Sequence, residues 1–326
     1  MNQSSTLTYN DRTHAYYYNG KRCKGVSAVA KIPTDTYNIE AWAKRMVAVG
    51  IATEPSLIEN VAAHIDNKER LDEVVEYALR AGKAHAAADR GTQMHRVLEL
   101  ILLDQEDKLL TAQQRADAEV LKRTLDRYKL APHKNMAEQF VIWPHYLVAG
   151  RFDAILETPD NQLVLTDLKS GPNAVAFPQA TAIQLALYAR APLMSADIHT
   201  TGDKSTIKDW QPLPEQLNRR HAYVLLVTPD DTVGTLHQLD IEHGWAAAQI
   251  ALKIVQWRKE LNNGQDIATQ VNDQTNVKPK PATWESLIAG ADTTERLREI
   301  WRRAKELDQL TPELKALALQ RCNELI

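Results

Sequence analysis

Cysteine is nearly absent from this chain, and several classes of site are excluded with it. The 326 residues include only Cys23 and Cys322. They offer no disulfide framework and too few thiolates for an iron–sulfur cluster or a four-cysteine zinc site, so a reducing cytoplasm is the expected compartment. An excess of positive charge is also lacking, because 39 Lys and Arg residues face 42 Asp and Glu residues. Binding of nucleic acid would therefore need a local basic patch.

Long apolar runs are lacking as well. No stretch is long enough to span a bilayer and the first residues are polar, so we expect neither a signal peptide nor a membrane helix. The hydrophobic fraction is nevertheless 44%, which is enough for one large core or two smaller ones. We therefore expect a globular protein.

The first part of the chain is expected to be mainly helical. The segments "TLTY" and "HAYYY" predict an N-terminal hairpin, and Asn19-Gly20 predicts a turn after it. From Ile39 to about Tyr128 the apolar residues recur at intervals of three and four, which indicates a block of helices. Residues 1–130 are therefore assigned to a hairpin and helices.

From about Glu138 the pattern changes to strands. The runs "EQFVIW", "YLVAGRFDAILE" and "QLVLTDL" are joined by short connections and predict an antiparallel meander, with a turn over 158–161. A helix over about 178–194, a polar loop, two further strands and a helix over about 245–261 are expected to follow. The predicted fold class is α/β with a mixed sheet of the α+β kind, and its core is residues 131–262.

The last part of the chain is expected to be separate. Residues 263–281 are polar and contain Gly and Pro, which predicts a linker. Residues 282–326 predict a small helical module with helix starts at Thr283, at the Thr293/Thr294 pair and at Thr311 before Pro312. Its Arg- and Glu-rich segment is typical of an exposed helix, and contact with DNA or a partner is the alternative.

The candidate site starts from an acidic residue two positions before a lysine. This spacing occurs at Asp66/Lys68, Glu106/Lys108, Asp167/Lys169 and Glu313/Lys315. Three of these pairs lie in polar or helical contexts, where solvated charges are expected. Asp167 and Lys169 end an apolar strand pattern instead, so both side chains are expected on one face of the strand and Leu168 on the other.

Asp153 lies on the preceding predicted strand, and the short turn is expected to bring it opposite Asp167, with Cβ atoms about 5 Å apart. Two adjacent carboxylates repel each other unless a cation neutralises them, and Mg²⁺ or Mn²⁺ prefers oxygen ligands. The carbonyl of Leu168 is a further candidate ligand. Lys169 is placed to orient or deprotonate an attacking water or to steady a phosphate. An Asp153–Lys169 surface salt bridge is the alternative.

Two helical pairs lie outside this strand motif. The segment "RGTQMHRVLELILL" predicts a helix capped at Thr92, on which His95 and Glu99 share one line beside the buried stripe. A packed histidine is the ordinary explanation. Downstream, Gln184 and Tyr188 are four apart on another predicted helix, where a surface glutamine and a core tyrosine would be ordinary.

In sequence order these motifs resemble the RecB-like branch of the PD-(D/E)XK nuclease superfamily, with its phage-type exonucleases. The matching residues are Gly91 and His95, Gly150 and Asp153, Asp167 and Lys169, and Gln184 and Tyr188. They span about residues 90–189. The opening "HAYYYNGKRCKGVSAVAKI" is also similar to phage-type members. The resemblance implies a PD-(D/E)XK nuclease core.

The resemblance also implies roles for the matching residues. His95, Asp153 and Asp167 would hold the divalent metal, and Lys169 would serve the attacking water. Some relatives carry a four-cysteine iron–sulfur cluster, which this chain has too few cysteines to build. Cluster-dependent roles are therefore not expected.

Further residues are expected near the DNA. The resemblance implies that Gln184 and Tyr188 support the site and contact DNA. Glu99 is a candidate for a second metal ion or a water. Arg90 and Arg151 are candidate phosphate contacts, although solvated surface charges are at least as common.

The expected activity is Mg²⁺- or Mn²⁺-dependent hydrolysis of DNA by in-line attack of water. The first expectation is an exonuclease on linear DNA in phage or bacterial recombination or repair. A structure-directed endonuclease on the same core and a catalytically silent nucleic-acid or protein-binding module are the alternatives. By analogy with phage recombination proteins, the C-terminal helices are expected to dock a strand-annealing or other recombination protein, and an oligomer stays open.

Overall fold

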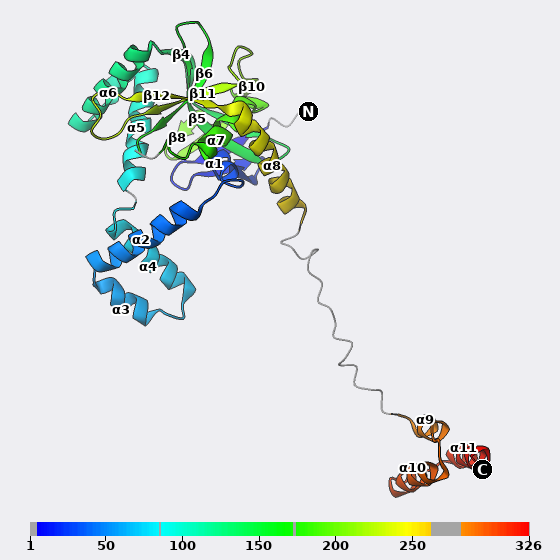
Figure 1. Cartoon of the computed structure of the whole chain (residues 1–326). Coiled ribbons are helices and arrows are strands. Elements are labelled where there is room, and N and C mark those ends of the chain that lie inside the picture. The colour runs from blue at the N-terminus through cyan, green and yellow to red at the C-terminus, as the bar shows by residue number, and fades with distance from the viewer. Residues whose placement is uncertain (1–4, 85, 172–173, 262–281, 326) are drawn as a thin grey trace. The chain divides into compact units, whose positions relative to one another are not determined.

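The computed structural model describes residues 5–84, 86–171, 174–261 and 282–325 (Figure 1). Met1–Asn262 form one compact unit and Asn263–Ile326 form another. The predicted linker over 263–281 lies outside the described residues. Within the described ranges, no helix combines the length and apolar character that crossing a membrane requires.

The centre of the first unit is a mixed sheet. The strands β4 (Ala131–Trp143), β5 (Val148–Glu157) and β6 (Leu163–Lys169) form the predicted antiparallel meander. The predicted turn between β5 and β6 is also present, closed by a hydrogen bond from the Thr158 N–H to the Gln162 carbonyl.

Two later strands complete this sheet. β11 (His221–Leu226) lies parallel to β6, and β12 (Thr235–Asp240) pairs antiparallel with β11. Because a parallel neighbour needs a crossover connection, the chain passes through helix α7 (Gln179–Ala189) between β6 and β11. β6 therefore lies between β5 on one side and β11 on the other.

One face of the sheet is covered by α7, by α1 (Val26–Ala30) and by α8 (Ile241–Glu260) (Figure 1). The other face is covered by α5 (Ala86–Leu102) and α6 (Ala112–Tyr128), which η1 (Glu106–Lys108) separates along the chain. Nearly the whole of β6 is buried, as expected for a strand between two helical layers.

A second set of strands extends the sheet. β1 (Leu7–Asn10) and β2 (Ala15–Tyr18) form the predicted hairpin, and β3 (Lys21–Gly25) leads from β2 to β5, with which it runs parallel. β1 also pairs with β9 (Lys204–Ile207), and β9 pairs with β8 (His199–Thr201). The N-terminal hairpin is thus tied to a segment that lies far away in the sequence.

Two short strands, β7 (Leu193–Ser195) and β10 (Trp210–Gln211), form the opposite edge of the sheet. β7 pairs with β4, and β10 pairs with β7. The sequence pattern predicts only a polar loop between the helix and β11, so β7 to β10 are a correction. Their few, mostly polar residues carry too little periodicity to indicate strands.

Three helices of the first unit pack on one another: α2 (Tyr37–Thr53), α3 (Ser56–Ala63) and α4 (Lys68–Ala81). Close approach of α2 and α4 depends on Gly50, because a Cβ there would lie 1.8 Å from the carbonyl oxygen of Ala78. A larger residue would force the two helices apart.

The C-terminal unit consists of α9 (Trp284–Ala289), α10 (Thr294–Glu306) and α11 (Pro312–Glu324). The three predicted helix starts are confirmed, and the capping residues are Thr283, Thr293 of the Thr293/Thr294 pair, and Thr311. Each side chain accepts a hydrogen bond from a backbone N–H of its helix. The three helices share a small apolar core of their own.

Three predicted helix limits are wrong. The helix bearing His95 is not capped at Thr92 but begins at Ala86, because the preceding alanine-rich segment continues it. The helix after β6 ends at Ala189 and not near Met194, where β7 forms instead. The last helix of this unit begins at Ile241, capped by the side chain of Asp240.

Candidate metal centre and catalytic site

Two carboxylates meet where the β5–β6 ladder ends. The last pair of the ladder is Ala154 and Thr166, so Asp153 and Asp167 are the next residues, one on each strand. The Asp153 Oδ2 accepts a hydrogen bond of 2.7 Å from the Leu168 N–H. The register that the short turn predicts is therefore the register of the structure.

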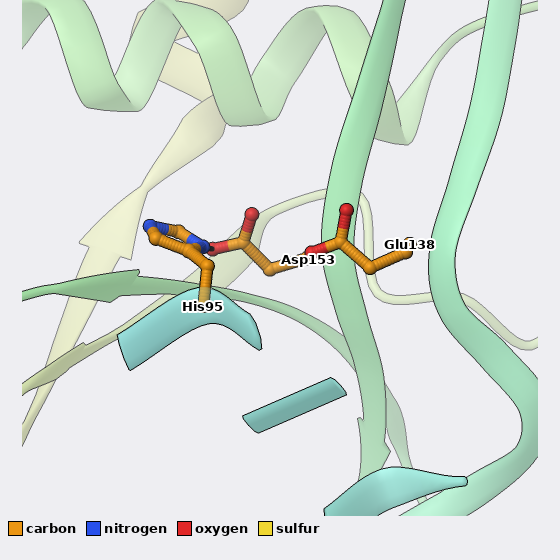
Figure 2. Close-up of side chains that lie close together, drawn as sticks. All are labelled: His95, Glu138 and Asp153. Atoms are coloured by element: carbon orange, nitrogen blue, oxygen red, sulfur yellow. Dashed lines mark ion pairs between the residues drawn. The ribbon is translucent and has the colours of Figure 1, made fainter. Parts of the chain in front are cut away.

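Helix α5 brings His95 to this strand end. Met94, Val97 and Leu98 are buried against the sheet, and His95 lies at the border of this stripe. The His95 Nδ1 lies 3.2 Å from Asp153 Oδ2 (Figure 2). The two motifs, which are more than fifty residues apart in sequence, thus meet in space.

Glu138 of β4 is the third member of the cluster. Ala137 pairs with Ala154 and Gln139 with Phe152, so Glu138 lies opposite Asp153 on the neighbouring strand. Ligand atoms of His95, Glu138 and Asp153 lie within 4.8 Å of one another (Figure 2). Sequence reasoning missed Glu138, because its place opposite Asp153 depends on the register of β4 after the irregularity between Pro132 and Ala137.

Each carboxylate of the centre has one cationic neighbour. Asp153 contacts His95, and Lys169 Nζ lies 2.6 Å from Asp167 Oδ2. Arg151 Nε lies 2.7 Å from a carboxylate oxygen of Glu138. Each of the three acids therefore has a basic side chain within ion-pair distance.

Burial and charge act against each other at His95 and Asp153. Burial alone would lower the pKa of His95, but the carboxylate of Asp153 outweighs it and raises the pKa to about 9. Burial alone would raise the pKa of Asp153, but the charge of His95 and the hydrogen bonds to it hold the pKa below its usual value. The two groups therefore stabilise each other's charged forms, and a cation bound by the imidazole would have to displace its proton.

The other two acids are shifted upwards. Burial, reinforced by the charge of Asp153, raises the pKa of Glu138 to about 8, against the opposing effect of Arg151. Burial also raises the pKa of Asp167, and Lys169 offsets this in part. Crowded carboxylates of this kind are stabilised in their charged form by a cation.

The donor atoms fit a hard divalent cation. Carboxylate oxygens are the ligands that Mg²⁺ and Mn²⁺ prefer, and the neutral imidazole of His95 would add one nitrogen donor. Asp167 Oδ2 is buried, and the Lys169 Nζ lies 2.6 Å from it. A cation at the site would thus share this carboxylate with Lys169.

Helix α7 supports the strand end from the other face. Gln184 Nε2 donates to Asp167 Oδ1 over 3.2 Å. Tyr188 is buried and its ring packs edge-on to Phe152. Gly150 makes room for it, because a Cβ at this position would lie 2.7 Å from Tyr188 Cε1. The structure thus places Gln184 beside an acid of the centre and Tyr188 in the core below it.

Two predicted phosphate contacts have partners inside the protein. Arg90 forms a two-pronged ion pair with the buried Asp117 of α6, with Nη2 2.6 Å from Oδ1. Arg151, besides its contact with Glu138, lies over the ring of Tyr9. Arg90 thus links α5 to α6, and Arg151 links β5 to the N-terminal hairpin.

Among the described residues, the cluster of His95, Glu138 and Asp153 includes neither Glu99 nor Asp167, so a ligand role for Asp167 stays a prediction. The Glu99 carboxylate forms an ion pair with Arg96 one turn earlier on α5. Leu168 contributes its N–H to Asp153, and a role for its carbonyl as a ligand stays a prediction.

The fold and the cluster define a mixed α/β protein with a candidate centre for a divalent cation at a strand end. A family model of the PD-(D/E)XK nuclease superfamily matches residues 67–322. The chain therefore belongs to the PD-(D/E)XK nuclease superfamily, whose members are metal-dependent nucleases. The predicted superfamily and the predicted fold class are confirmed. A search of curated proteins found no match.

Proposed function

We propose that this protein is an Mg²⁺-dependent deoxyribonuclease of the RecB-like branch, and that it acts as an exonuclease on linear DNA in recombination or repair. The observation that carries the proposal is the meeting of His95, Asp153, Asp167 and Lys169 at one strand end. These residues come from three elements, and only the fold brings them together.

Each residue has a defined task in this proposal. His95, Asp153 and Asp167 hold the cation, and the Leu168 carbonyl is a further candidate ligand. When bound, the cation supplies a Lewis acid that offsets negative charge on the phosphate during hydrolysis. Lys169, whose Nζ lies beside Asp167, donates hydrogen bonds to the attacking water or to the phosphate.

Gln184 and Tyr188 act as supports. Gln184 fixes the orientation of Asp167 through its amide N–H, and partners of this kind strongly influence metal affinity. Tyr188 fills the space that Gly150 leaves and holds β5 against α7. A direct contact of Gln184 with DNA and a phosphate contact of Arg151 remain part of the proposal.

The test uses end-labelled linear duplex DNA and a covalently closed circle of the same sequence. Each is incubated with the full-length protein in Mg²⁺, in Ca²⁺ and in EDTA, and with Asp167→Asn in Mg²⁺. Asp160→Asn is the matched control, because Asp160 lies in the exposed β5–β6 turn close in sequence to the site.

The proposal expects Mg²⁺-dependent loss of the linear DNA only, preserved in Asp160→Asn and abolished in Asp167→Asn. Cleavage of the closed circle would replace the exonuclease with a structure-directed endonuclease. Lack of cleavage of either DNA by folded protein would contradict nuclease activity and favour a binding module.

A further inference from the structure

The proposed function leaves Glu138 without a task. This residue lies in the middle of the sheet, where a charged side chain is costly unless it is paired or binds a cation. Its side chain is only 14% exposed. Glu157, at the far end of β5, is by contrast 39% exposed beside His133. Glu138 is thus an acid that the fold buries beside Asp153 and His95.

The backbone holds Glu138 in an uncommon conformation. Its φ is 51°, in the left-handed region that side chains other than glycine seldom adopt. The β4–β5 register is also irregular just before it, between Pro132 and Ala137. Irregular strand geometry of this kind re-aims a side chain and is frequent beside functional sites. Here it directs the carboxylate toward Asp153 and His95 (Figure 2).

Arg151 fixes the Glu138 carboxylate from the opposite side. Its Nε contacts Glu138 Oε2, and its guanidinium lies over the rings of Tyr9 and Phe140 at 5.2 and 5.8 Å. A second contact, of 3.4 Å, reaches Asp11 after β1. Because a carboxylate has several acceptor sites on its two oxygens, the contact with Arg151 leaves sites for a cation.

We propose that Glu138 is an additional ligand of the divalent cation held by His95 and Asp153, and that Arg151 sets the orientation of its carboxylate. This inference rests on the proposed function for the cation itself. It assigns the extra acid to β4 and not to Glu99 of α5, which is engaged by Arg96. The N-terminal hairpin then contributes to the centre indirectly, because Tyr9 of β1 packs against Arg151 of β5.

The experiment measures Mn²⁺ binding to the full-length protein without DNA, by calorimetry and by the electron paramagnetic resonance signal of free Mn²⁺. Glu138→Gln removes the charge and keeps the shape, while Glu138→Asp keeps the charge opposite Arg151 and withdraws the oxygens by one methylene. Glu157→Gln is the matched control on the same pair of strands. Melting in EDTA shows that each variant is folded.

We expect both Glu138 variants to bind Mn²⁺ at least about tenfold more weakly, since even outer partners of metal ligands contribute roughly 10- to 100-fold. Glu157→Gln is expected to bind like the wild type. If Glu138→Gln does not fold, the folded Glu138→Asp variant decides. Weak Mn²⁺ binding by Glu138→Asp supports the inference, and Mn²⁺ binding as tight as in the wild type overturns it.

Other outcomes overturn the inference in distinguishable ways. Wild-type affinity in a folded Glu138→Gln would reject Glu138 as a ligand while the proposed nuclease stands. If Glu138→Gln binds Mn²⁺ like the wild type and Glu99→Gln binds it more weakly, Glu99 would be the additional ligand. A wild-type protein that neither binds Mn²⁺ nor cleaves DNA would reject the proposed function and this inference together.

Discussion

Asp167 and Lys169 on β6 and Glu313 and Lys315 on α11 have the same spacing in sequence and opposite surroundings. In β6 the two side chains share a face, and the carboxylate is 4% exposed. At the start of α11 residues two apart diverge by roughly 200° around the axis, and both side chains are exposed. An acid-x-lysine pair becomes a site only where a strand aligns its side chains and the fold buries them.

The largest expected effect separates the two lysines. Lys169→Met should lower the rate of Mg²⁺-dependent cleavage of linear DNA by roughly 10²- to 10⁴-fold, the range lost with a group that assists proton transfer. Lys315→Met should leave the rate unchanged. Initial rates at equal protein concentration measure this, and an equal effect of both substitutions would break the comparison.

A second comparison concerns ion pairs. Asp117→Asn should lower the free energy of unfolding of the first unit by about 3–5 kcal/mol, because it leaves the guanidinium of Arg90 without its buried partner. Glu324→Gln removes the partner of Arg321 on the exposed surface of α11 and should have no measurable effect. Urea denaturation followed by circular dichroism measures both. Equal changes in the free energy of unfolding for the two variants would contradict the claim that the buried pair stabilises the fold more than the exposed pair.

Two glutamine–carboxylate hydrogen bonds of equal length provide a further comparison. Gln184 donates to Asp167, and Gln320 donates to Glu324, each over 3.2 Å. Gln184→Leu should weaken Mn²⁺ binding or cleavage by roughly 10- to 100-fold, as for partners of metal ligands. Gln320→Leu should change neither, so a wild-type result for Gln184→Leu would remove its supporting role.

The smallest expected effect lies in the C-terminal unit. Thr311 caps α11 by accepting a hydrogen bond from the Leu314 N–H, and Thr311→Ala should destabilise that helix by about 1 kcal/mol. Hydrogen exchange of the α11 amides should then be roughly fivefold faster, with the rate of DNA cleavage unchanged. Slower cleavage in this variant would show that the module contributes to catalysis.

Much of the fold was predictable because its signals are local. The meander follows from three alternating runs with short turns, and the helices follow from apolar spacing. The strands β7 to β10 could not be predicted, because each has only two to four residues and β9 acquires its partner β1 from almost two hundred residues earlier. The predicted first residues of two helices were wrong. These helices begin at Ala86 and Ile241, because residues before the apolar pattern also adopt helical structure.

The residues of the site likewise fall into those that could be predicted from local sequence and those that could not. The closeness of Asp153 and Asp167 follows from one short turn, and the approach of His95 was implied by the resemblance to a family. Glu138 was not predicted, because its place opposite Asp153 depends on the register of β4 after an irregularity that the sequence does not reveal. The partners of Arg90 and Arg151 likewise depend on tertiary packing.

The central claim is that α5, β5 and β6 build one centre for a divalent cation. The most direct measurement is a crystal of the wild-type protein grown with Mn²⁺ and an anomalous difference map at the manganese edge. We predict a peak within coordination distance, about 2.0–2.4 Å, of His95, Asp153 and Asp167. A well-ordered strand end without such a peak, or a peak only at another place in the molecule, would contradict the account.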